Sequence, residues 1–131
     1  MIDAANDPEQ LLAAQGALLR RSKKGSVLIV DLRPLGAEAT DEELGLAAMF
    51  PKLRELHAAG ASITDAGVAQ LAGLEQLSTL DLQQTQVTDA IWPVIQSLPQ
   101  LKLLLLTGSQ VTTEGIAAAR PKMIGARIVF A

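Results

Sequence analysis

The sequence has no cysteine, no tyrosine, a single histidine and very few aromatic side chains. Without cysteine, disulfide bonds, thiolate metal sites and cysteine nucleophiles are excluded. One tryptophan and two phenylalanines leave burial to aliphatic side chains and give no stacking platform for nucleic-acid bases. The net charge of -3 also argues against nucleic acid as the main ligand, because phosphate binding needs concentrated positive charge. We expect no cofactor.

Signals for export or membrane insertion are missing as well. The first ten residues, MIDAANDPEQ, have no basic start and no apolar core of a secretory signal. The stretch from Leu101 to Leu106 is apolar but far too short to cross a bilayer. We therefore expect no membrane partner and, if the chain is full length, a cytoplasmic location. A domain excised from a longer protein is the alternative.

What the chain does have is an internal repeat. Stretches of 24 residues begin at Leu53 (LRELHAAGASITDAGVAQLAGLEQ) and Leu77 (LSTLDLQQTQVTDAIWPVIQSLPQ), and the pattern returns at Leu101 (LKLLLLTGSQVTTEGIAAARPKM). Apolar residues first follow a period of two, as in a strand, and then the spacing of a helix. Each unit should be a strand, a turn and a helix, so the period predicts a solenoid in which neighbouring units bury one another.

The Thr-Asp step of each unit marks the start of its helix. Thr64, Thr88 and Thr112 are expected to cap the helices, and Asp65 and Asp89 place negative charge at their positive ends. We interpret these residues as structural.

These units resemble leucine-rich repeats, of the bacterial kind with a recurring V-T-D-A-G-L step that is common in planctomycete proteins. The resemblance covers about residues 27–123. It departs from the pattern at Ala58, at Ile91-Trp92-Pro93, where we expect an irregular helix start, and at Thr113-Glu114. It implies an α/β solenoid with a curved parallel sheet of about five strands, helices on the convex side, and a concave face that most often binds protein.

We predict a single domain over residues 1–131. Asp7 and Pro8 indicate a helix start, and the apolar spacing to Leu19 predicts an N-terminal capping helix within 7–24 that ends near Ser22. Repeats follow at 27–52, 53–76, 77–100 and 101–123, with a terminal strand at 124–131. In that strand we favour Ile128 and Phe130 as inward residues over Ala126 and Ile128, because the first choice buries the larger pair.

The concave face should show every second strand residue, since alternate side chains point to opposite sides of a sheet. Its central row is predicted to be Asp31, His57, Asp81 and Leu105. The residues that we predict for partner contact on this face are Asp31, Arg33, Glu55, His57, Thr79, Asp81, Gln83, Leu103, Leu105 and Thr107.

The central row places the only histidine between two carboxylates, because neighbouring strands lie about 4.8 Å apart. Three interpretations of Asp31, His57 and Asp81 follow. They could bind zinc or manganese, but no second set of supporting ligands is evident. They could serve hydrolysis, but His57 lacks a recognisable nucleophile. The simplest interpretation is a hydrogen-bonded polar row, and we predict neither a metal site nor catalytic residues.

A second surface feature is the strand around Leu103 and Leu105, which is apolar on both sides. Such a strand is normally covered on both sides, so these leucines, with Val129, should form an interface patch. We predict a non-enzymatic module that binds an unidentified protein through its concave face and this patch, or a weak homodimer through the same leucines. A structural spacer or capping domain of a larger protein is the alternative.

The basic residues gather at only one place, Arg20, Arg21, Lys23 and Lys24. We interpret this cluster as the solvated end of the capping helix, where cations are favoured. A functional contact is the alternative.

Overall fold

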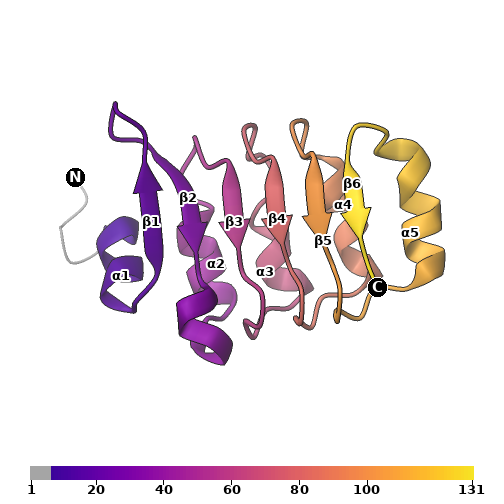
Figure 1. The fold of residues 1–131 in the computed structure, drawn as a ribbon, viewed down its shortest axis with the longest axis horizontal. Helices are drawn as coiled ribbons and strands as arrows, with labels where there is room; N and C mark the ends of the chain where they lie inside the picture. The colour runs from indigo at the N-terminus through magenta and orange to yellow at the C-terminus, as the bar shows by residue number, and fades with distance from the viewer. Residues whose placement is uncertain (1–6) are drawn as a thin grey trace.

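The computed structural model describes residues 7–131 and shows one mostly parallel sheet with helices on one of its faces (Figure 1). The sheet has six strands in the order β1-β2-β3-β4-β5-β6; a parallel sheet of about five strands was expected, and the antiparallel β1 was not. β2 to β6 are parallel, and β1 runs antiparallel to β2. The strands are β1 (Leu18–Arg21), β2 (Val27–Asp31), β3 (Glu55–His57), β4 (Thr79–Asp81), β5 (Leu103–Leu105) and β6 (Arg127–Val129).

The helices are short: α1 precedes β1, and α2 to α5 follow β2 to β5 in turn. In Figure 1, α2, α3 and α4 lie behind the sheet. Within residues 7–131, no helix has the length and apolar content needed to cross a membrane. The α-helices are α1 (Pro8–Ala14), α2 (Asp41–Ala47), α3 (Asp65–Ala69), α4 (Trp92–Gln96) and α5 (Thr113–Ala119), and the 3-10 turns are η2 (Arg33–Glu38), η3 (Asp89–Ile91) and η4 (Arg120–Lys122).

The N-terminal segment corrects the predicted helix over 7–24. Asp7 caps α1 as expected, but α1 ends at Ala14 and the chain turns at Gly16, whose φ of 101° is left-handed. Such a backbone suits glycine and stops a helix. The following residues form β1, so the apolar residues Leu18 and Leu19 lie in a strand and not on a helical stripe.

The core lies between the sheet and the helices. Leu56, Leu80 and Leu104, at the centres of three strands, are fully buried. Along the sheet, Leu104 pairs with Ile128, which is 6% exposed, and Phe130 is partly buried against the same core. The register that we favoured for the last strand is therefore confirmed.

The unit that contains Ile91-Trp92-Pro93 has the irregular helix start that its sequence predicts. A 3-10 turn, η3, precedes α4, and Pro93 sits in the first turn of α4, where its missing N–H costs no helical bond. Trp92 is buried, and its indole N–H donates to Asp89 at 2.9 Å.

Successive units are joined by hydrogen bonds between an aspartate and the threonine that precedes the next helix. In each pair, one carboxylate oxygen accepts the threonine backbone N–H at 2.7–3.1 Å, and the other accepts its hydroxyl at 2.6 Å. We call these contacts the Asp–Thr ladder; its pairs are Asp41 with Thr64, Asp65 with Thr88, and Asp89 with Thr112. The expected capping role holds at Thr88 and Thr112, whereas the Thr64 side chain makes no cap bond.

The ladder explains the glycine of the V-T-D-A-G step. A Cβ at Gly67 would lie 2.1 Å from Asp41 Oδ1, and one at Gly115 would meet the preceding unit's carboxylate at 2.0 Å. In the first unit, Glu43 occupies the same place, and its buried carboxylate accepts the Thr40 N–H at 2.7 Å and hydroxyl at 2.9 Å. At these two positions glycine makes room for the carboxylate of the preceding unit. In unit 77–100, Ile91 stands at the corresponding position, at the end of η3, and Asp65 still binds Thr88.

Candidate protein-binding face

The face of the sheet opposite the helices, which we call the open face, carries the residues predicted for partner contact. Strand pairing places Asp31, His57, Asp81 and Leu105 side by side, as their spacing predicts. The same row extends to Leu18 at one end and Val129 at the other. The second row consists of Arg20, Ile29, Glu55, Thr79, Leu103 and Arg127.

Leu18 was not predicted for this face, because its apolar spacing placed it in the capping helix. It is 61% exposed, and its pairing with Asp31 puts it at the end of the central row. Gly16, two residues earlier, was the signal that could have located it, since a glycine after an apolar helix commonly marks the helix end.

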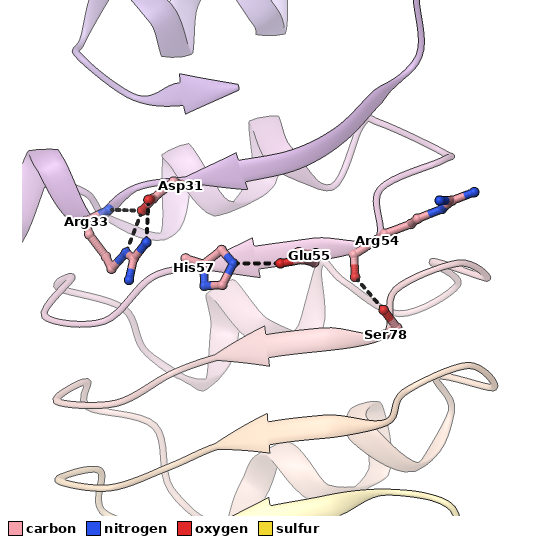
Figure 2. A network of polar contacts seen from close by, with 6 residues as sticks. All are labelled: Asp31, Arg33, Arg54, Glu55, His57 and Ser78. Carbon is pink, nitrogen blue, oxygen red and sulfur yellow. Dashed lines mark hydrogen bonds and ion pairs between the residues drawn. The ribbon is translucent and has the colours of Figure 1, made fainter. Parts of the chain in front are cut away.

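His57 does not bind the aspartates on either side. Figure 2 shows its ring directed along its own strand, with Nε2 3.1 Å from Glu55 Oε1. The Asp31 carboxylate instead accepts hydrogen bonds from Arg33: from the backbone N–H at 3.0 Å, Nε at 2.9 Å and Nη2 at 2.7 Å. The neighbouring positions in the row were predicted correctly. The side chains of Asp31 and His57, however, form their hydrogen bonds with residues of their own repeat units.

Asp81 is the most deeply covered group of the central row, at 3% exposure. Its Oδ1 accepts from the backbone N–H and the side-chain amide of Gln83, both at 3.1 Å. A buried carboxylate needs such donors, because desolvation otherwise disfavours its charge.

The hydrogen bonds of Asp31, His57 and Asp81 run to other residues and not to one another. Within residues 7–131, no three histidine or carboxylate side chains come together as metal ligands. The two aspartates are held by Arg33 and Gln83 instead.

The Asp31–Arg33 ion pair sets the electrostatics of one end of the face. The hydrogen bond from the Arg33 guanidinium lowers the pKa of Asp31 against the opposing effect of burial, and the same contact raises the pKa of Arg33. Asp81 adds a further attraction for the Arg33 charge. Three carboxylates lie here, those of Asp31, Glu55 and Asp81. Because Arg33 supplies the one guanidinium beside them, the polar centre of the open face is acidic.

The apolar end of the face consists of Leu103, Leu105 and Val129. All three are partly exposed, whereas Leu104 between the two leucines is fully buried. Thr107, one of the residues predicted for partner contact, accepts the Ala131 N–H on its hydroxyl at 3.3 Å. The open face therefore grades from an acidic polar centre to an apolar patch.

Acid should weaken the fold through two carboxylates. Burial tends to raise the pKa of Asp89, but the hydrogen bonds from Thr112 and Trp92 outweigh it, so the pKa is lowered, as is that of Asp31. A lowered folded pKa gives stability that is present above the ordinary value of 3.8 and lost as pH falls through the folded pKa. The urea midpoint should be flat from about pH 7 to 5 and fall below about pH 4.

The matched variants for this acid effect are Asp89→Asn and Glu42→Gln, the second at an exposed helix-start carboxylate. Asp89→Asn should lower the midpoint at pH 7 and make its fall below pH 4 shallower, while Glu42→Gln should follow the wild type. Parallel pH curves for wild type and Asp89→Asn would contradict the assignment.

The geometry is that of a leucine-rich-repeat-like fold, and comparison with known proteins supports this class. A solved structure titled "Leiomodin-1 Actin-Binding Site 2 (ABS2)" is similar over 100% of this chain and 81% of that chain, with a TM-score of 0.63 and 10% sequence identity. At that identity the likeness concerns the fold alone. No family model matches the sequence, and no curated protein matches it.

Proposed function

We propose that the chain is a non-enzymatic interaction module, a leucine-rich-repeat solenoid of the V-T-D-A-G-L type that binds a protein partner through its open face. The apolar patch of Leu103, Leu105 and Val129 is the anchor, and the acidic centre around Asp81 and Glu55 sets the orientation of the partner. Interfaces commonly combine an apolar core with a polar surround.

The observation that carries the proposal is the apolar patch on β5 and β6. Leu103 and Leu105 point away from the core, yet nothing in their own strand requires leucine there, since Leu104 already supplies the inward contact. The corresponding positions of β4 are Thr79 and Asp81. Partly exposed leucines that the fold does not need are expected at a protein contact.

The polar centre supports the same proposal because it is preorganised. Asp31 and Asp81 are held by hydrogen bonds before any partner arrives. Ordering these side chains therefore costs little on binding. We expect the partner to place apolar side chains over the patch and a cationic side chain over Glu55, whose side chain is 39% exposed.

The solved neighbour supplies a fold-level analogy. Its title gives actin binding to that protein, which supports a protein as the class of ligand for this fold. Because fold does not determine function, the partner of this chain has to be found without assuming its identity.

The test is affinity capture from native cell extract with purified wild type and with a Leu103→Ser/Leu105→Ser variant. Removing two apolar anchors should reduce recovery of the specific partner at least about tenfold, since each buried leucine contributes about 1.5–3 kcal/mol. The measurement is quantitative mass spectrometry, followed by a Kd for the recovered protein.

The matched control is Met49→Ser/Ile124→Ser, which removes two exposed apolar side chains outside the two rows of the open face. It should recover the partner as the wild type does. Equal recovery by all three proteins would refute the patch as the binding surface. Light scattering supplies a second arm: a wild-type mass that rises with concentration, lost in the Leu103→Ser/Leu105→Ser variant, would make the partner a second copy of this chain.

A further inference from the structure

A hollow of about 390 Å³ lies beside the turn that joins β1 to β2. Two lysines of that turn, Lys23 and Lys24, line it together with Lys52 and Arg54 from the segment that leads into β3. Ser26 and Gln76 add polar groups to its wall. We call this depression the basic hollow. The basic cluster was expected at a helix end, but Arg20 and Arg21 lie in β1, and Lys23 and Lys24 lie in the turn that follows.

The cations of the basic hollow have no acidic partners. Within residues 7–131, the ion pairs are those of Arg21 with Glu9, Arg33 with Asp31 and His57 with Glu55. None of them involves Lys23, Lys24, Lys52 or Arg54, and no carboxylate lines the hollow. Four cations gathered without a counter-charge repel one another, in a protein whose net charge is -3.

The backbone that carries these cations is firmly held. The Ser22 N–H donates to the Ser26 carbonyl at 2.8 Å, and the Ser26 N–H donates to the Ser22 hydroxyl at 3.2 Å, which closes the turn. On the opposite wall, the Arg54 N–H donates to the Leu28 carbonyl at 2.7 Å, and the Ser78 hydroxyl donates to the Arg54 carbonyl at 3.1 Å. Figure 2 shows the Arg54 side chain directed away from the Glu55–His57 pair.

We propose that the basic hollow binds an acidic segment of a protein chain, whose carboxylate or phosphate groups are paired by Lys23, Lys24, Lys52 and Arg54. Arginine can bind such a group through two parallel hydrogen bonds, and lysine supplies mobile positive charge. The site is distinct from the leucine patch of the open face, so this inference stands independently of the function proposed above.

The dimensions and surroundings favour a peptide over other polyanions. A nucleic acid would need a longer basic stripe or aromatic stacking, and none of the residues that line the hollow is aromatic. A membrane surface would favour apolar side chains beside the cations. The large apolar residues with high exposure in residues 7–131, Leu18, Met49 and Ile124, do not line it.

The experiment measures the fluorescence anisotropy of labelled hexaglutamate, and of a labelled doubly phosphorylated serine peptide, with the full chain at low salt. Lys52→Glu/Arg54→Glu should weaken binding of the better peptide at least about tenfold, and raising the salt should weaken wild-type binding. Arg120→Glu/Lys122→Glu changes the net charge by the same amount at the other end of the chain, and should weaken binding less than about threefold. Both variants alter exposed side chains.

Lys23→Gln/Lys24→Gln provides a second variant on the opposite wall and should also weaken binding, by about threefold or more. The preferred peptide shows whether carboxylate or phosphate is the source of the negative charge. Absence of wild-type binding to both peptides would overturn the proposal, as would equal losses in Lys52→Glu/Arg54→Glu and Arg120→Glu/Lys122→Glu. Tighter binding to single-stranded oligonucleotides or to phosphatidylserine vesicles than to either peptide would likewise overturn it.

Discussion

Replacing Leu104 with alanine should lower the free energy of unfolding by about 3 kcal/mol, whereas the same replacement at Leu105 should cost less than about 1 kcal/mol. The two residues are neighbours in β5 and identical in type. Leu104 is fully buried between the sheet and the helices, while Leu105 points to the open face and is partly exposed. Truncating Leu104 therefore leaves a cavity in the core. Truncating Leu105 leaves a space on the protein surface, which water can occupy. Urea denaturation followed by circular dichroism measures both values.

The comparison has a functional counterpart. Leu105→Ala should retain the fold and weaken partner binding, while Leu104→Ala should act on stability first. Equal losses of stability at the two positions would mean that the open face is covered by something the fold requires. That result would contradict both the stated alternation and the proposal that this face is free for a partner.

Gly67→Ala should destabilise the protein by about 2 kcal/mol, although alanine is the better helix former by up to about 1 kcal/mol. The new Cβ would lie 2.1 Å from Asp41 Oδ1 and 2.9 Å from Ile63 Cγ2. Asp41 would have to leave the Thr64 N–H and hydroxyl, which it binds at 2.8 and 2.6 Å. Donors that lose an acceptor account for the expected loss, which thermal and urea unfolding would measure.

The control for this effect is the Asp41→Ala background. There the carboxylate is absent, so adding Gly67→Ala should be neutral or stabilising through helix propensity. The change of sign between the two backgrounds separates the ladder from a general intolerance of alanine at this position. An equal cost of Gly67→Ala with and without Asp41 would show that Ile63 or the helix packing, and not the ladder, requires the glycine.

Much of the fold could be predicted because its determinants are local and repeated. A spacing of 24 residues sets the parallel register from Glu55 through Thr79 to Leu103, and the structure pairs these residues. The same periodicity identified the inward leucines and the last strand. The N-terminal strand was not predicted, because it belongs to no repeat and its two adjacent leucines lack the alternation of a strand while they continue the helical spacing of the preceding residues.

The site was less predictable because side-chain orientation depends on local partners. Row position correctly placed Asp31 beside His57, but the bidentate contact with Arg33 governs where that carboxylate points. The basic hollow depends on the β1–β2 turn meeting Lys52 and Arg54, which lie some thirty residues further along the chain. The repeat pattern of the sequence does not predict that these two segments lie together.

In the Asp–Thr ladder, the aspartate of one unit always binds the threonine of the next unit along the chain. Units that carry both residues can therefore be exchanged or duplicated within the array. The unit 77–100 carries both halves of the contact: Thr88 receives the preceding aspartate, and Asp89 serves the following threonine. A duplicated copy of such a unit carries the threonine and the aspartate that its two neighbours need. The array could therefore be lengthened by gene duplication without further substitutions at the contacts between units. The unit with Glu43 fills its own acceptor place, and a unit with Thr113 offers no carboxylate, so neither could be moved to the interior without a new junction.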